Sequence, residues 1–240
     1  MKPKVSVIMN TYDEDPISLA YAIKSYVTQE GVNMQLIISA PQDDKNLSLL
    51  MECVVNYNTP TATVELNLIE RHEKCPTNSY RQLNSAIKMI KGKWFAFASS
   101  NDIAEQNKFS VEISQLVSTK KKVCYSAFFR CNPNNTKDLM RFHDYDYNKH
   151  LIGNFVSDCA TMSVDILKDN TPFKLRFKNF AFWDFWLRVY EKEGNVFIYN
   201  PVPTWNYNIK DDSMHIERLK DTDKVLENTK DKIRMLWSHV

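Results

Sequence analysis

The feature that most constrains this chain is a regular alternation of short apolar runs and amphipathic stretches over its first 130 residues. The runs at residues 5–9, 35–39, 63–69, 94–98 and 123–129 are rich in β-branched and aromatic residues, which is typical of buried parallel strands. Between them, apolar residues recur at helical spacing. Strands that alternate with helices predict right-handed crossovers, and hence an α/β fold with a mostly parallel sheet covered on both faces.

The spacing also predicts which helical residues face the core. Asp15-Pro16 provides a cap and a first-turn proline for the first helix. The expected inward residues of the four helices are Leu19, Ala22, Ile23, Tyr26 and Val27; Leu47, Leu50, Met51 and Val54; Tyr80, Leu83, Ile87 and Ile90; and Phe109, Ile113, Leu116 and Val117.

The pattern changes after residue 130. Residues 130–150 are polar and aromatic without a clear period, which predicts a long surface excursion. A helix over 183–194, strands over 195–200 and 203–209, and a charged terminal helix follow, the last with Ile216, Leu219, Ile233 and Trp237 inward. We expect a single domain, 1–240, composed of a first half (1–130), a second half (131–213) and a helical tail (214–240).

Composition excludes several classes of protein. The formal net charge of only +2 gives no overall indication of binding to nucleic acid or to an acidic membrane. The four glycines lie too far apart for a dinucleotide fingerprint or a P-loop, and the five histidines show no zinc spacing. The five cysteines form no C-x-x-C pair, which fits free thiols in a reducing compartment. With no apolar run long enough for a signal peptide or a span of about 20 residues, we expect a cytoplasmic protein without a membrane span.

An open parallel sheet binds its ligand at the carboxyl ends of its strands. The segments to weigh are therefore residues 10–15, 40–44 and 99–102. Here the sequence resembles the family 2 glycosyltransferases of GT-A fold, in which the first strand ends in a turn like "MNTYDED" and a later strand ends in Asp-Ser-Asp-Asp, aligned with "IKGKWFAFASSNDI". "FVSDCATMSVDIL" and "DDSMHIE" resemble the spore-coat polysaccharide biosynthesis type of that family.

The resemblance implies a fold and a reaction. It implies a GT-A-like domain whose first half binds a nucleotide-diphosphate sugar, UDP- or dTDP-linked, and whose second half binds a glycan or other hydroxyl acceptor, with inversion at the transferred sugar. The residues expected to bind the nucleotide are Thr11, Tyr12, Asp13, Asp43, Ser99, Ser100 and Asn101. Arg71, His72, Lys74 and Arg81 are weighed for the diphosphate, and His215 for a phosphate.

The metal position departs from the family. A hard cation, Mn²⁺ or Mg²⁺, would neutralise the leaving diphosphate and would be held by carboxylates. This chain has Asn101 at the position of the family's metal ligand and Asp102 after it. Weak metal binding at these two residues, replacement of the metal by positive side chains, and loss of catalysis remain open, as does a simple helix cap.

The catalytic base also departs from the family, since Ala181 and Phe182 occupy the positions of its Glu-Asp pair. An inverting transfer needs a carboxylate to take the acceptor proton, and Asp158 and Asp184 are the candidates. For Asp184, a helix cap or a partner of Arg188 one helical turn later is slightly favoured over a base. Asp158 is weighed equally as a carboxylate that stabilises its loop. The alternative to an enzyme is a degenerate GT-A domain that binds a nucleotide or a protein; a nucleic-acid-modifying transferase rests on Lys120–Lys122 and the polar excursion alone.

Overall fold

The computed structural model describes residues 5–70, 78–134, 136–168, 172–209 and 231. In this part of the chain a seven-stranded sheet has the order β10-β6-β9-β4-β1-β2-β3. Its strands are β1 (Val5–Asn10), β2 (Met34–Pro41), β3 (Ala62–Ile69), β4 (Trp94–Ser99), β6 (Val123–Ser126), β9 (Thr161–Ser163) and β10 (Phe197–Asn200). All pair in parallel except β9, which runs antiparallel between β4 and β6. The α/β fold with a mostly parallel sheet is confirmed.

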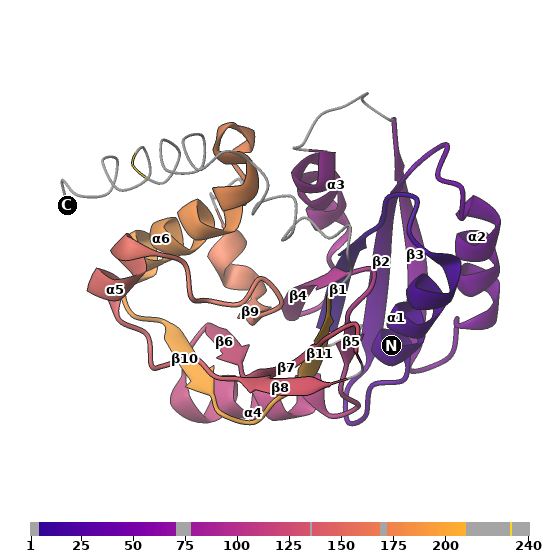
Figure 1. Ribbon diagram of the computed structural model, residues 1–240. Coiled ribbons are helices and arrows are strands. Elements are labelled where there is room, and N and C mark those ends of the chain that lie inside the picture. The colour runs from indigo at the N-terminus through magenta and orange to yellow at the C-terminus, as the bar shows by residue number, and fades with distance from the viewer. Residues whose placement is uncertain (1–4, 71–77, 135, 169–171, 210–230, 232–240) are drawn as a thin grey trace.

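Helices cover both faces of this sheet (Figure 1). They are α1 (Pro16–Val27), α2 (Leu47–Asn56), α3 (Asn78–Ala86), α4 (Lys108–Thr119), α5 (Tyr147–Ile152) and α6 (Ala181–Glu193), with short 3₁₀ turns at Ile87–Met89, Val164–Leu167 and Leu175–Phe180. Alternate residues of β4 face opposite ways, as strand geometry requires. Phe95 and Phe97 join the core under α3 and α6, whereas Ala96 and Ala98 join the core under α1, α2 and α4.

A second, four-stranded sheet has the order β5-β11-β7-β8 and is built from β5 (Ile103–Ala104), β7 (Phe128–Cys131), β8 (Lys137–Met140) and β11 (Trp205–Asn208). The single strand expected over 123–129 was wrong, because the chain leaves the large sheet at Ala127. There the Ala127 amide donates to Asn200 O at 2.9 Å, and Ala127 O accepts from Thr204 N at 3.2 Å. The excursion expected at 130–150 does lie at the surface, since its described residues are exposed or half-buried up to residue 149. It is not irregular, however, because it contains most of the β7-β8 hairpin and the start of α5.

The inward faces of three helices differ from the expected stripes. The stripe expected from Tyr80 to Ile90 runs past the end of α3 at Ala86, so Ile87 lies in a 3₁₀ turn and Ile90 follows it. Met51 of α2 and Val117 of α4 are 56% and 62% exposed. In α4 the buried face instead includes Lys108 and Glu112, which form an ion pair inside the protein. The terminal helix expected over 214–240, with Ile216, Leu219, Ile233 and Trp237, lies outside the described residues apart from position 231.

Candidate functional site

The carboxyl ends of β4, β1 and β2 meet at one edge of the large sheet. Asn10, the last residue of β1, pairs in register with Ser39 of β2 and with Ser99 of β4. The loops that follow these three strands therefore lie beside one another, at the edge where open parallel sheets bind ligands. The register brings together the three segments that the sequence selected, residues 10–15, 40–44 and 99–102.

The loops after β1 and β2 are tied together by two carboxylates. Asp44, only 4% exposed, accepts the Asp13 amide at 3.0 Å and the Asn46 amide at 2.9 Å. Asp13 in turn accepts the Lys45 amide at 2.9 Å. These bonds hold Asp13 at φ +50°, a left-handed conformation that aspartate tolerates better than most residues. Asp13 thus shapes the loop, while Asp43 is exposed at the end of β2.

Thr11 and Tyr12 follow β1 directly. The Tyr12 side chain is 46% exposed at this edge. Thr11 is buried, its amide donates to Ser39 O at 3.0 Å, and its carbonyl accepts Gln82 Nε2 at 3.1 Å. The Thr11 hydroxyl and Gln82 Oε1 are buried without a hydrogen-bond partner in the described part of the chain. Gln82 of α3 was not among the residues selected from the sequence, because nothing in a helical pattern separates it from a solvated polar residue.

Ser99 ends β4, and Ser100, Asn101 and Asp102 follow it; we call these four residues the corner. The corner is hydrogen-bonded to Asn208 at the end of β11. The Ser99 hydroxyl donates to Asn101 Oδ1, and Asn101 Nδ2 donates to Asn208 O at 3.2 Å. In return, Asn208 Nδ2 donates to Asn101 O, and the Asn208 amide donates to Asp102 Oδ1 at 3.1 Å. Asp102 is only 2% exposed. We call these four bonds the Asn101–Asn208 bridge; it joins the end of β4 and the residues after it to the second sheet.

Glu14 contacts this corner and was not named from the sequence. Its Oε2 accepts the Ser100 hydroxyl at 3.2 Å, and its backbone carbonyl accepts Asn46 Nδ2 at 2.8 Å. The signal that could have found it is the run Asp13-Glu14-Asp15 after a buried strand. Asp15 has a different role, because it caps α1 by accepting the Ser18 amide at 2.8 Å.

Asp158 lies at the same edge as the corner. It is an exposed residue in the turn before β9, and Thr161 at the start of β9 pairs with Ala96 of β4. Because β9 runs antiparallel to β4, this turn lies toward the carboxyl end of β4. The neighbouring Cys159 is buried, and burial together with the Asp102 charge raises the pKa of its thiol. Cys159 is therefore a neutral thiol and not an activated nucleophile.

Asp184 lies in a different environment. It is 1% exposed in the first turn of α6 and accepts Arg188 Nε at 2.8 Å, while Arg188 Nη2 donates to Pro172 O. Phe182 packs among aromatic rings, with centroids 5.5 Å from Phe97 and 4.6 Å from Phe173. Phe182 thus belongs to an aromatic cluster, and Asp184 is held in an ion pair.

The donor groups at the corner do not fit a hard divalent cation. Mg²⁺ and Mn²⁺ prefer anionic oxygens in near-octahedral arrangement. Here Oδ1 of the Asn101 side chain accepts the Ser99 hydroxyl, and Oδ1 of the buried Asp102 accepts the Asn208 backbone amide. Within the described ranges no three His, Cys, Asp or Glu side chains are placed to share a metal ion. Arg71, His72, Lys74 and His215 lie outside the described residues, and Arg81 is exposed on α3.

A buried polar cluster joins α4 to β6, to β9 and to the residue before β11. Glu112 of α4, fully buried, pairs with Lys108 at 2.7 Å and accepts the hydroxyls of Ser126 and Thr204 at 2.7 and 2.6 Å. Its second oxygen accepts the Thr161 hydroxyl. We call these five residues the Glu112 cluster. Thr161 starts β9, just after the Asp158 turn, and Thr204 immediately precedes β11, which ends at Asn208.

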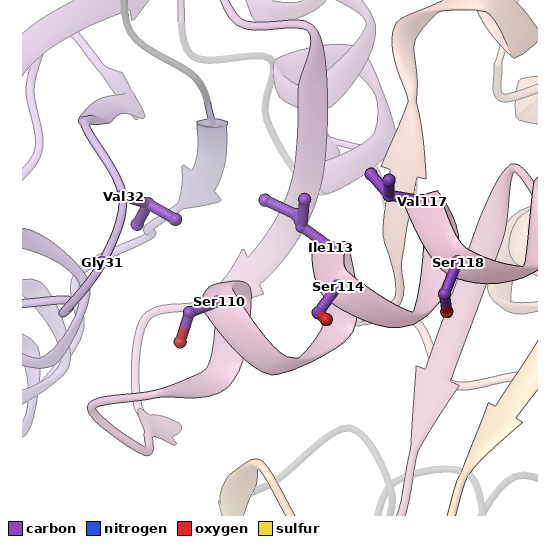
Figure 2. A pocket seen from close by; sticks show the side chains of 7 residues that line it. All are labelled: Gly31, Val32, Ser110, Ile113, Ser114, Val117 and Ser118. Carbon is purple, nitrogen blue, oxygen red and sulfur yellow. The ribbon is translucent and has the colours of Figure 1, made fainter.

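A hollow of about 400 Å³ lies elsewhere, between α4 and the loop before β2 (Figure 2). Figure 2 shows Ser110, Ser114 and Ser118 along one side of α4, Ile113 and Val117 on another side, and the loop at Gly31 and Val32 near the first turn of the helix. Because this loop leads into the amino end of β2, the hollow is at the sheet edge opposite the strand carboxyl ends. It does not belong to the candidate site.

This sheet order, with its three loops and the antiparallel strand inserted beside β4, is the GT-A fold of glycosyltransferases. Residues 1–349 of S. aureus TarS in complex with UDP-GlcNAc superpose with a TM-score of 0.70 at 14% identity, over 88% of this chain and 60% of that one. The mannosyltransferase PcManGT of Pyrobaculum calidifontis, in complex with GDP-Man and Mn²⁺, gives 0.62 at 13% identity, over 91% and 61%. The chain spans only 42% of the longer TarS chain that it matches at 0.68 and 16% identity.

The sequence is also similar to a curated Escherichia coli protein, the UDP-Glc:alpha-D-GlcNAc-diphosphoundecaprenol beta-1,3-glucosyltransferase WfgD. The two are 26% identical over 198 residues, which is 80% of this chain and 71% of WfgD. The sequence matches no protein-family model. In the part of the chain that the structure describes, no helix is both long and apolar enough to cross a membrane.

Proposed function

We propose that this chain is a glycosyltransferase that moves a sugar from a UDP- or dTDP-linked donor to an acceptor hydroxyl with inversion. The observation behind the proposal is the alignment of Asn10 with Ser39 and Ser99, which gathers three polar loops at one sheet edge. Similarity to WfgD, a glucosyltransferase named for a UDP-Glc donor, favours an enzyme over the degenerate binding module.

The nucleotide is proposed to bind over the ends of β1, β2 and β4. Tyr12, exposed at this edge, offers an aromatic face on which a base can stack, and Thr11 a hydroxyl beside it. Asp13 and Asp43 would contact the nucleoside side of the donor. Ser99, Ser100 and Asn101 would face its diphosphate. UDP is favoured over dTDP because WfgD is named for UDP-Glc and TarS was solved with UDP-GlcNAc.

Asp158 is proposed as the catalytic base. Its carboxylate would take the proton of the acceptor hydroxyl as that oxygen bonds to the sugar carbon and the nucleoside diphosphate leaves. Its support is exposure at the edge that holds Ser99–Asp102, whereas Asp184 is buried against Arg188. Asp184 is the second candidate.

A cation would, when bound, neutralise charge on the leaving diphosphate. PcManGT was solved with Mn²⁺, but Asn101 and Asp102 do not fit that role here, so no step of this proposal uses a metal. The finer parts of the proposal rest on sequence: a polysaccharide acceptor as in the spore-coat type, a cytoplasmic location, and the division at residues 130 and 213.

The direct test of the donor site is the thermal shift produced by a nucleotide panel. UDP should bind with a dissociation constant on the order of micromolar to millimolar, and saturating UDP should therefore raise Tm. Tyr12→Ala should make that rise in Tm smaller. GDP and ADP serve as controls for base selectivity. If no nucleoside diphosphate, with or without Mn²⁺, stabilises the protein, both the transferase and the nucleotide-binding alternative fail.

A further inference from the structure

The Asn101–Asn208 bridge uses every polar group of the Asn101 side chain. Oδ1 accepts the Ser99 hydroxyl, and Nδ2 donates to the Asn208 carbonyl at 3.2 Å. The Asn101 backbone carbonyl accepts Asn208 Nδ2. An amide at position 101 therefore satisfies one donor and one acceptor at once, which a carboxylate cannot do.

Aspartate at this position would oppose the bridge. Its carboxylate would have no hydrogen to give to Asn208 O and would place a charged acceptor against that carbonyl. The bond from Ser99 would survive, because either side chain accepts it. The replacement of the family's aspartate by Asn101 thus has a structural reason within this chain.

Asp102 is committed to the same bridge. One of its oxygens accepts the Asn208 amide at 3.1 Å, and the residue is 2% exposed. A hard cation could bind Asp102 and the Asn101 side-chain oxygen only by displacing their hydrogen bonds and by reaching the buried Asp102. It would gain only one anionic ligand and one amide oxygen. Asn101 and Asp102, the two candidate metal ligands, are therefore already hydrogen-bonded, and their bonds to Asn208 hold the end of β11.

We infer that Asn101 is a positioning residue that fixes β11 to the carboxyl end of β4, and that donor binding in this chain does not require a divalent cation at that corner. This inference rests on the proposed function, since it concerns the same donor site. From ligand charge alone, Asn101→Asp would be expected to strengthen metal binding by supplying an anionic oxygen. The hydrogen bonds of Asn101 predict the opposite outcome.

The test compares the unchanged protein with Asn101→Asp and with Asn107→Asp, which adds the same charge at an exposed residue before α4. UDP binding is measured by titration calorimetry in EDTA and in Mn²⁺. Tm is measured without nucleotide, with and without Mn²⁺. We expect the unchanged protein to bind UDP with a dissociation constant that differs less than about threefold between the two buffers, and Mn²⁺ alone to leave its Tm unchanged.

For Asn101→Asp we expect Tm to fall by at least about 2 °C, the shift of a bond worth about 1 kcal/mol in a chain of this size. UDP binding should weaken several-fold in both buffers, and Mn²⁺ should restore neither quantity. Asn107→Asp should match the unchanged protein. Asn208→Ala, which leaves position 101 intact but removes one bond of the bridge, should weaken UDP binding in the same metal-independent way.

Two results would overturn the inference and leave the proposed function standing. One is UDP binding to the unchanged protein at least tenfold tighter in Mn²⁺ than in EDTA. The other is an Asn101→Asp protein that binds UDP more tightly in Mn²⁺ than the unchanged protein does. If UDP does not bind in any buffer, the proposed function fails instead, and an undiminished Tm of Asn101→Asp would then refute the bridge.

Discussion

At the scale of single residues, Asp158 and Asp184 differ in what surrounds their carboxylates. Asp158 is exposed at the sheet edge that also holds Ser99–Asp102. Asp184 is buried and paired with Arg188, whose guanidinium also lies over the Phe185 ring at 5.7 Å. A base must reach the acceptor hydroxyl to take its proton, so the two residues are expected to respond differently to the same substitution.

Asp158→Asn should lower turnover by roughly 10² to 10⁴ while the donor dissociation constant stays nearly unchanged, because only proton removal is lost. Asp184→Asn should keep turnover within about threefold and lower the free energy of unfolding by about 1 to 3 kcal/mol, because Arg188 loses a charged partner. Steady-state rates and urea unfolding of both variants separate the two roles. Turnover lost only in Asp184→Asn would assign the base to that residue.

At the scale of elements, the Glu112 cluster aligns the strands that carry the site. It links α4 to β6, to β9 after the Asp158 turn, and to Thr204 before β11. A buried ion pair does not guarantee stability, since its desolvation offsets much of its attraction. Here three hydroxyls satisfy the carboxylate as well, so the cluster fixes the relative positions of four elements.

Glu112→Ala should lower the free energy of unfolding by about 3 to 5 kcal/mol, because it leaves Lys108 charged and buried without its partner. The double variant Lys108→Met with Glu112→Leu should be clearly less destabilised, since it buries no unpaired charge. Urea unfolding of both, with Val117→Ala as an exposed control on the same helix, measures the difference. Equal losses in the single and double variants would show that packing volume, and not charge, decides stability here.

The strands and helices of the first half follow from apolar periodicity, whereas the Glu112 cluster does not. Periodicity placed β1 to β4 and α1 to α4 because apolar burial decides those elements. It assigned Val117 of α4 to the core and left out Lys108 and Glu112. The burial of this pair depends on hydroxyl groups in β6, in β9 and just before β11, which the pattern of α4 alone does not reveal. The antiparallel β9 was missed for a similar reason: a strand of three residues gives no periodic signal.

The site divides in the same way. Loops at strand carboxyl ends follow from topology, so the placement of Thr11, Tyr12 and Ser99–Asp102 at one sheet edge could be predicted from the sequence. Glu14, Gln82 and Asn208 were not, because their contacts depend on how loops fold over the sheet edge. The identity of the true base and the donor contacts stay predictions until they are measured.

At the scale of the whole molecule, folding stability should depend on pH through His150. This residue of α5 is fully buried, and neither ring nitrogen has a hydrogen-bond partner in the described part of the chain. Burial, with a smaller contribution from His143, lowers its pKa to about 3, although the nearby Asn154 side chain acts the other way. The unfolded chain, with a histidine pKa near 6.5, binds the proton more readily than the folded chain does. The free energy of unfolding is therefore unaffected by His150 above about pH 6.5, and it decreases as the pH falls from there toward 3.

Urea unfolding midpoints between pH 7.5 and pH 5 check this prediction. The unchanged protein should lose up to about 1.4 kcal/mol per pH unit below the unfolded pKa from this residue alone. His150→Leu should flatten the profile, and His143→Gln, a change at an exposed histidine, should not. An unchanged slope in His150→Leu would place the titrating group elsewhere.

The measurement that tests the central claim most directly is release of UDP from UDP-glucose and UDP-GlcNAc by the unchanged protein, in EDTA and in Mn²⁺. A glycosyltransferase should release UDP slowly by transferring the sugar to water even without its acceptor, and Asp158→Asn should lower the rate of that release by roughly 10² to 10⁴. The account predicts UDP release in both buffers from at least one of the two donors. UDP binding without release from either donor, in either buffer, would contradict the claim and leave a nucleotide-binding domain of GT-A fold.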